Sequence, residues 1–400
     1  MEEWKERKVS ELIQEISMGP FGSNIKVDNF VDSGVPVLNG SNLQGYKLNE
    51  DSFNYVSEEK ADSLGKASAH RGDIVITHRG TLGQIIYIPQ NSKFNRYVIS
   101  QSQFRLKLKS EIVRPDYFVY FFHTRIGQHK ILMNASQVGV PALARPTTTF
   151  KEVSIPIPPL SVQDRIMAIL LCIDDKIELN HKINSNLEEQ AKALFKSWFI
   201  DFEPFKGGKF VESEFGMIPE GWEVSYLEHL GKFKRGKTII AKNAKEGLIP
   251  VVAGGMEPAY YHNVANTKGP VITVSASGAN AGYMRLYYQD VWASDCSFLD
   301  NSNENLLWIY CFLNNNRRVL RHAQTGAVQP HVKPADINSI TVCIPPHDLI
   351  SKFQNTVSPL FKSIGLHQQE TERLQKTRDT LLPKLMSGEI DVEHSKLLFI

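Results

Sequence analysis

Apolar residues recur with matching spacing in two segments that lie 187 positions apart along the chain. One segment follows the sequence Ile-Pro-Pro at 157–159, and the other follows the same sequence at 344–346. Steps of four and three residues separate successive positions of the pattern, which is the 3.5-residue period of a coiled coil. The polar residues Asn180 and Asn184 occupy its middle, and His367 and Thr371 hold the same places in the second copy. The pattern predicts two long paired helices, with these pairing residues: Ile166, Leu170, Ile173, Ile177, Leu187 and Leu194 in the first, and Phe353, Val357, Leu360, Ile364, Leu374 and Leu381 in the second.

The alternative is that each helix packs only on its own domain. We favour pairing because the two repeats match position for position. Since each helix follows its domain in the same chain order, a pseudo-twofold arrangement would make the pair antiparallel. Pro359 and Gly365 are expected to bend or weaken the second helix. About 38 residues of helix would extend about 57 Å and would hold two globular parts at a fixed separation.

The segment before each helix has strand-like and helical runs in the same order. Strands are predicted at 73–77 and 84–88 and again at 271–274 and 283–287, and helices are predicted at 117–133 and 305–320. Glycine-containing loops connect the strands of each pair, and the loop sequences differ between the copies. One fold that carries two different surfaces is the simplest interpretation.

We therefore expect an α/β (α+β) protein with two similar globular domains, each followed by a long helix. The predicted boundaries are 1–155 for the first domain, 156–203 for the central helix, 204–216 for a linker, 217–343 for the second domain, 344–390 for the C-terminal helix and 391–400 for a tail.

Composition narrows the class of protein. An apolar fraction of 42% over 400 residues is typical of globular cores. The N-terminus has no apolar signal region and no apolar run is long enough to cross a bilayer, so we expect a cytoplasmic chain with no membrane partner. The four cysteines show no paired spacing, which favours reduced thiols over disulfides or a zinc site. A net charge of +2 neither demands nor excludes nucleic acid.

Catalytic motifs are missing from the sequence. It contains no GxxxxGK[ST] phosphate loop, no HExxH, no CxxC and no Asn/Asp-Pro-Pro-aromatic tetrad. Asp201, Glu203 and Lys206 resemble a nuclease cluster, but the predicted linker offers no strand to present them. We therefore expect a non-catalytic chain with no metal site and no cofactor of its own.

The glycine-containing loops present short polar and basic side chains. Arg, Asn, Gln, Ser and Thr are residue types that read base edges, and Arg and Lys also bind phosphates. The candidate DNA-binding residues are Ser23, Ser41, Asn42, Thr77, His78, Arg79, Thr81, Arg96, Gln101 and Arg145 in the first domain, and Lys234, Arg235, Lys237, Ser275, Ser277, Asn280, Gln329 and His331 in the second.

An aromatic cluster ends the central helix and enters the linker. It consists of Phe195, Trp198, Phe199, Phe202 and Phe205. Packing of a domain onto its helix is the favoured interpretation. Docking of a partner protein is the alternative, because exposed aromatic patches favour interfaces.

Several segments resemble the specificity subunit of type I restriction–modification systems over essentially the whole chain. They are 157–160 with Gln163, 173–180 (Ile-Asp-Asp-Lys-Ile-Glu-Leu-Asn), 193–202 (Ala-Leu-Phe-Lys-Ser-Trp-Phe-Ile-Asp-Phe), 380–390 (Thr-Leu-Leu-Pro-Lys-Leu-Met-Ser-Gly-Glu-Ile), 19–23 (Gly-Pro-Phe-Gly-Ser) and 79–83 (Arg-Gly-Thr-Leu-Gly). In the second copy, Gly278 and Gly282 fit the last motif, but Ser277 replaces Arg79.

The resemblance implies two target recognition domains that each read one half of a bipartite DNA sequence, with the helices as the spacer between them. It implies double-stranded DNA and two methyltransferase (modification) subunits as partners, and it allows for restriction subunits. S-adenosylmethionine, ATP and Mg would bind those partner subunits, so this chain would be the non-catalytic part of an adenine-N6 methyltransferase and endonuclease assembly. A coiled-coil scaffold that joins two protein-binding domains without touching DNA is the alternative.

Overall fold

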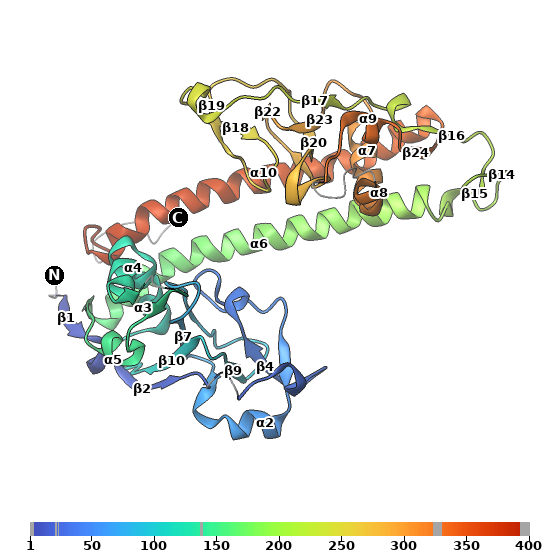
Figure 1. Cartoon of the computed structure of the whole chain (residues 1–400). Helices are drawn as coiled ribbons and strands as arrows, with labels where there is room; N and C mark the ends of the chain where they lie inside the picture. The colour runs from blue at the N-terminus through green and yellow to red at the C-terminus, as the bar shows by residue number, and fades with distance from the viewer. Residues whose placement is uncertain (1–3, 21, 23, 137–138, 323–329, 393–400) are drawn as a thin grey trace. The chain divides into compact units, whose positions relative to one another are not determined.

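The computed structural model describes residues 4–20, 22, 24–136, 139–322 and 330–392. Contacts within the chain divide it into a first unit, residues 1–176 with 373–400, and a second unit, residues 177–372. Each unit contains one globular domain and a part of each long helix (Figure 1). The mixed helix and strand content agrees with the predicted fold class.

The two long helices are α6 (Leu160–Phe199) and α10 (His347–Met386), each of 40 residues. In the second unit Asn180 Nδ2 donates to Thr371 Oγ1 at 3.3 Å, while Asn184 Oδ1 lies 2.9 Å from His367 Nδ1. Later residues of α6 therefore meet earlier residues of α10, which confirms an antiparallel pair. The pseudo-twofold relation between the domains stays a prediction.

Both long helices also contribute side chains to the core of each domain. In the first unit Ile166 and Leu170 share a buried cluster with Leu382 and Leu385 and with domain residues such as Phe118. The predicted pairing residues that are buried are Ile166, Leu170, Ile177, Phe353, Val357 and Ile364; those that are half-buried are Ile173, Leu187, Leu194, Leu360, Leu374 and Leu381. Helix pairing and packing on the domain, posed as alternatives, occur together.

Pro359 and Gly365 do not interrupt α10, and the expectation that they bend or weaken it stays a prediction. Packing explains the glycine. A Cβ atom at Gly365 would lie 2.8 Å from the ring of Tyr288, so the missing side chain lets this tyrosine pack directly on the helix. The contact offsets the low helix propensity of glycine.

The first domain contains two larger sheets, besides the two-stranded pairings β1-β13 and β11-β12. One has the strand order β2-β10-β7-β8, in which all neighbours are antiparallel, and the other has the order β3-β5-β4-β9-β6. The strands are β1 (Lys5–Lys8), β2 (Ile13–Met18), β3 (Phe30–Val31), β4 (Val35–Leu38), β5 (Asn54–Val56), β6 (Ser68–His70), β7 (Ile74–Thr77), β8 (Ile85–Tyr87), β9 (Arg96–Ile99), β10 (Gln103–Leu108), β11 (Ala135–Ser136), β12 (Ala142–Leu143) and β13 (Ser154–Ile157). Its α-helices are α1 (Val9–Leu12), α2 (Glu58–Ser63), α3 (Pro115–His123), α4 (Arg125–Leu132) and α5 (Pro146–Lys151).

The second domain repeats this plan. Its main sheet has the order β17-β23-β20-β21, and β16 pairs with β24 as β1 pairs with β13. Its strands are β16 (Glu223–Tyr226), β17 (Lys234–Arg235), β18 (Ile249–Val252), β19 (Tyr260–His262), β20 (Val271–Ser275), β21 (Met284–Tyr287), β22 (Trp292–Ala293), β23 (Cys296–Asp300) and β24 (Thr341–Ile344), and its α-helices are α7 (Leu306–Asn315), α8 (Arg317–His322) and α9 (Pro334–Asn338).

The helices predicted at 117–133 and 305–320 are each broken in two, which corrects both predictions. Thr124 has an extended backbone (φ −69°, ψ 160°), and its hydroxyl accepts a hydrogen bond from Gly127 N at 3.0 Å. It therefore caps α4 and ends α3. Asn316 separates α7 from α8 in the second domain. Each domain has this break at a corresponding place.

The aromatic cluster packs within the second unit. Phe199 lies 5.0 Å from Phe353 and 5.6 Å from Trp308, measured between ring centroids, and Phe195 is buried beside both. Packing of the domain onto its helix, the favoured interpretation, accounts for these rings. The predicted linker, 204–216, contains β14 (Phe210–Ser213) and the first residue of β15 (Gly216–Pro219), and the two strands form a β-hairpin that continues into the predicted second domain. Among the described residues, no helix is long and apolar enough to cross a membrane.

The contact between Gly365 and Tyr288 predicts that Gly365→Ala destabilises the protein. Alanine should gain about 1 kcal/mol of helix propensity, but the close approach of its Cβ to the ring should cost about 1–3 kcal/mol. Urea denaturation of the full chain measures the difference. In a Tyr288→Ala background the same substitution should stabilise. A stabilising Gly365→Ala in the otherwise unaltered chain would contradict this account of the glycine.

Candidate nucleic-acid interface

The loop between β7 and β8, residues 78–84, lies at the surface of the first domain. Gly80 and Gly83 have positive φ angles of 90° and 86°, which glycine adopts without strain. Gly80 N donates to Pro141 O at 2.8 Å, and Leu143 N donates to His78 O at 2.8 Å. These bonds pin the loop to the β12 segment and leave the Arg79 side chain exposed.

Two further loops meet this one. Gln84 Nε2 donates to Gly40 O at 3.0 Å, which ties in the loop that carries the exposed Ser41. His78 Nε2 lies 3.2 Å from Gln101 O, and burial lowers the pKa of His78, so the neutral ring donates this bond. We name the resulting group the first loop surface: the exposed Ser41, Arg79, Thr81 and Gln101 with the half-buried His78.

Other predicted residues of this domain have structural roles or lie elsewhere. Thr77 is 4% exposed and donates to Gln84 Oε1 at 3.0 Å. Asn42 is 1% exposed and holds its loop closed through Asn49 O and Ser52 O, each at 3.0 Å.

The two remaining arginines differ in their surroundings. Arg96 is at the opposite end of β9 from Gln101, and its guanidinium forms an ion pair with Asp62 at 2.6 Å. Arg145 is exposed in a left-handed conformation at the start of α5 (φ 46°). Ser23 lies outside the described residues.

The second domain builds its equivalent loop in the same way. Gly278 and Gly282 both have a positive φ of 78°, and Val332 N donates to Ala276 O at 3.0 Å. An antiparallel bridge joins Ser277 to His331, as a bridge of the same kind joins Arg79 to Ala142. The repeated fold therefore places Ser277 where the first domain has Arg79.

A carboxylate that the sequence did not indicate organises the second loop. Asp295 forms an ion pair with Arg235 and accepts a hydrogen bond from Ser277 Oγ at 2.9 Å. Lys234 and Lys237 are exposed on either side of Arg235. We name Lys234, Arg235, Lys237, Ser277 and His331 the second loop surface.

Three predicted residues remain. Ser275 is 4% exposed and donates to Gly254 O at 3.1 Å, so its hydroxyl is structural. Asn280 is half-buried in the turn, where its backbone carbonyl accepts a hydrogen bond from Tyr283 N at 2.9 Å. Gln329 lies outside the described residues.

Sequence reasoning noted Gly19 in a motif of the resembling family but missed the structural role that it shares with Gly236. Gly19 follows β2 and Gly236 follows β17, at the same place in each repeat. A Cβ at Gly19 would lie 2.0 Å from Ser100 O, and one at Gly236 would lie 2.3 Å from Ser294 O. Both backbones therefore pass in close contact with the neighbouring strand segment. Comparing the two repeats strand by strand would have revealed the pair.

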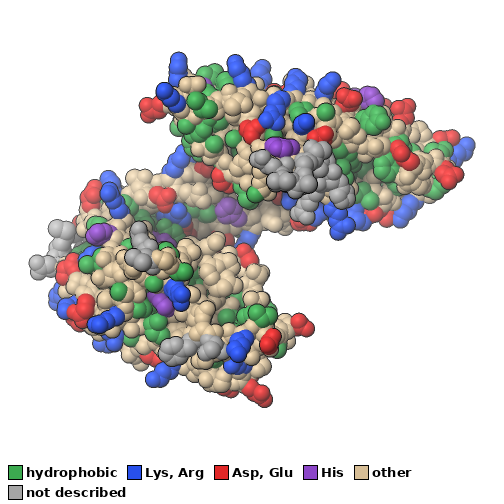
Figure 2. All heavy atoms as spheres, viewed as in Figure 1, with side chains coloured by type: hydrophobic (Ala, Val, Ile, Leu, Met, Phe, Trp, Pro, Cys, Tyr) green, Lys and Arg blue, Asp and Glu red, His purple; other side chains and the backbone are tan. Residues whose placement is uncertain are grey.

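The two loop surfaces offer hydrogen-bonding and basic groups. Figure 2 shows Lys and Arg side chains spread over the visible faces of both units. Within the described part of the chain, no three His, Cys, Asp or Glu residues are placed to hold a metal ion. Such surfaces suit contacts to phosphates and base edges.

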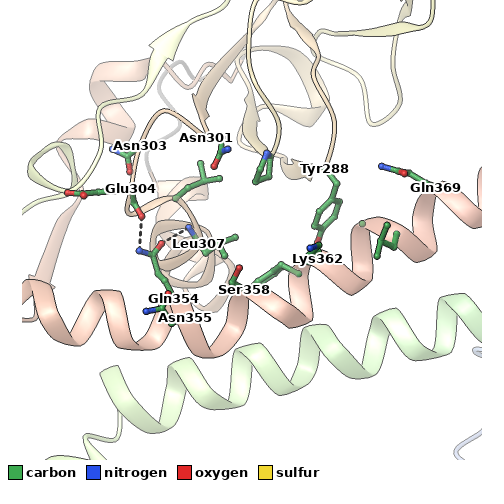
Figure 3. A pocket seen from close by; sticks show the side chains of 15 residues that line it. Tyr288, Asn301, Asn303, Glu304, Leu307, Gln354, Asn355, Ser358, Lys362 and Gln369 are labelled. Carbon is green, nitrogen blue, oxygen red and sulfur yellow. Dashed lines mark hydrogen bonds between the residues drawn. The ribbon is translucent and has the colours of Figure 1, made fainter.

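A cavity of about 500 Å³ lies beside α10 in the second unit (Figure 3). Gln354 projects from the helix and accepts from Leu307 N at 3.2 Å, while its amide donates to Glu304 O at 2.7 Å. This side chain caps the start of α7, as Gln163 of α6 accepts from Arg114 N at the start of α3 at 2.9 Å. The hydrogen bonds at this edge of the cavity anchor the domain to its helix.

Comparisons with known proteins agree on one family. The model of the type I restriction modification DNA specificity domain matches residues 1–189 and 219–376. The chain is 28% identical to the type I restriction enzyme MjaIX specificity subunit of Methanocaldococcus jannaschii, over 98% of this chain and 94% of that protein. It is 23% identical to the HindI specificity subunit of Haemophilus influenzae, over 98% and 100%.

A solved structure shows the same fold. The S subunit of a type I restriction-modification system from M. genitalium superimposes with a TM-score of 0.62 at 18% identity, and the match covers 96% of each chain.

The close approach at Gly236 predicts that Gly236→Ala destabilises the second unit by about 1–3 kcal/mol, because the new Cβ would collide with backbone that has little room to move. Urea denaturation measures the change. Gly207→Ala is the matched control, since its Cβ would meet nothing within 4 Å. Equal stabilities for the two variants would show that the close approach at Gly236 is not required.

Proposed function

The chain belongs to the family of type I restriction–modification DNA specificity domains, and from that premise we propose that it selects the DNA sequence on which a type I complex acts. The observation that supports this most is the repeated construction of two loop surfaces at equivalent places in two domains of one fold. Their side chains differ, with Arg79 in one and Ser277 in the other. Two such surfaces would read two different short sequences.

Each loop surface would bind DNA through its basic and polar groups. Arg79 in the first domain and Lys234 and Lys237 in the second are exposed cations that would bind phosphates or guanine edges. Ser41 and Gln101 would supply shorter-range hydrogen bonds to bases. The antiparallel helices α6 and α10 would set the length of the unread spacer between the half-sites.

The chemistry would belong to partner subunits. Two methyltransferase subunits would dock on this chain, bind S-adenosylmethionine and methylate adenine at N6. Restriction subunits that join the complex would bind ATP and Mg. This chain would contribute sequence selection and a frame for assembly, and it would carry out no bond-making step itself.

A coiled-coil scaffold that never touches DNA is the competing function. It predicts that the complex of this chain with its methyltransferase shows no sequence-dependent shift of a DNA duplex in a gel. The DNA-reading function predicts a shifted band. A competitor duplex with the specific sequence should remove this band more effectively than a shuffled duplex does.

Exchanging residues 1–155 for the corresponding domain of another specificity subunit should alter one half of the methylated sequence and leave the other half and the spacer unchanged. Both long helices would be retained, and the incoming domain would complete its core on them as the present one does. Sequencing of methylated adenines in cells that carry the hybrid gives the result. A hybrid that changes both halves would contradict the assignment of one domain to one half-site.

Arg79→Ala should weaken binding of the complex to its target and lower the dependence of log K on log[salt] by about one unit, as expected for one lost phosphate contact. Titrations at several salt concentrations measure both quantities. Lys66→Ala is the control, because Lys66 is exposed in the short helix η3 (Gly65–Ala67), outside the first loop surface. Unchanged affinity and salt slope for Arg79→Ala would remove this residue from the contacts.

A further inference from the structure

A polar cluster in the first unit joins the two long helices to the globular domain. Arg378 of α10 donates from Nη1 to Asp174 Oδ1 of α6 at 2.7 Å, and the Tyr120 hydroxyl of α3 donates to the other oxygen of the same carboxylate. The side chains of Arg378 and Asp174 are only 17% and 18% exposed. Burial and the Asp174 carboxylate raise the pKa of Tyr120, so its phenol remains a hydrogen-bond donor.

Tyr46 brings a loop of the domain into this cluster. Its ring stacks on Tyr120 with a centroid distance of 4.0 Å and an interplanar angle of 18°. The guanidinium of Arg378 lies 5.1 Å from the centroid of the Tyr46 ring, within the range of a cation–π contact. Arg378 therefore holds both the carboxylate of the other helix and the ring of the loop.

The same loop extends to the first loop surface. Tyr46 O accepts from Tyr87 N at 3.1 Å, which fixes its backbone on β8. Asn42, next to Ser41, donates to Asn49 O and Ser52 O and so closes the loop that contains Tyr46, and Gly40 O accepts from Gln84 Nε2 at 3.0 Å. The exposed hydroxyl of Ser41 and the packed ring of Tyr46 thus belong to one short, internally bonded segment.

The second unit has no ion pair at the positions that correspond to Asp174 and Arg378. The shift of 187 residues places Phe361 opposite Asp174 and Ala191 opposite Arg378. Both are buried, and Phe361 packs edge-on against Tyr310 with a centroid distance of 5.4 Å. An apolar contact therefore replaces the ion pair, so the two domains are attached to the helices by different means.

We propose that Arg378, together with Asp174, is a positioning residue for the DNA contacts of the first domain. The ion pair and the cation–π contact hold Tyr46, and Tyr46 holds the loop that presents Ser41 and supports Gln84. The inference rests on the proposed function, and it adds that a residue of the C-terminal helix controls how precisely the N-terminal domain discriminates among sequences.

The test uses the full chain in complex with its methyltransferase. Methylation rates are measured on the matched duplex and on duplexes with one mismatch in either half-site, the half-sites being assigned by the exchange of residues 1–155. Arg378→Met removes the charge but keeps an unbranched side chain of several carbons. Lys376→Met, two residues earlier on an exposed position of α10, is the matched control. Arg378→Lys tests whether the charge alone restores the effect.

Arg378→Met should lower discrimination against mismatches in the half-site of the first domain about tenfold, within the range that one base pair contributes. Discrimination in the other half-site should not change, and Arg378→Lys should recover part of the loss. Because discrimination is a ratio of rates in one preparation, a smaller folded fraction does not alter it.

Unchanged discrimination in Arg378→Met, or an equal loss in both half-sites, would overturn the positioning role while leaving the proposed function intact. A loss of the same size in Lys376→Met would also overturn it. Failure of the unaltered complex to discriminate among duplexes would overturn the proposed function itself.

Discussion

The hydrophobic cores of both domains depend on the two long helices. In the first unit Ile166 and Leu170 of α6 and Leu382 and Leu385 of α10 lie in the same buried cluster as the domain's aromatic side chains. In the second unit Phe195 and Phe353 do the same. Each fully buried side chain of this size contributes about 1.5–3 kcal/mol. The domains are therefore not independent modules attached to a rod, because each uses both helices to complete its interior.

This shared core explains why the helices repeat so closely while the loops do not. A change at a buried helix position affects the core of a domain, whereas a change in an exposed loop such as that of Arg79 or Ser277 affects only what the surface contacts. The glycines that shape the loops are retained in both copies, as Gly80 with Gly83 and Gly278 with Gly282. A constant frame with variable loops is the arrangement that a two-part sequence reader requires.

The sequence predicted the long helices and the repeated domains because both rest on regular apolar spacing. It failed where a local feature overrides that spacing: the apolar pattern continues across Thr124, although this residue ends one helix and caps the next. It also could not reveal partners distant in the chain. Asp295 pairs with Arg235, 60 residues away, and Arg96 pairs with Asp62. Only the folded structure therefore shows which basic residues already form ion pairs within the chain.

If this chain determines which DNA sequence its complex modifies, its loss must change adenine methylation in the cell. Methylated adenines are sequenced in cells with the methyltransferase gene intact, with and without the gene for this chain. A two-part methylated sequence with a fixed spacer should disappear when the chain is removed and return when it is restored. An identical pattern of adenine methylation with and without the chain, in the presence of an active methyltransferase, would contradict this role of the chain.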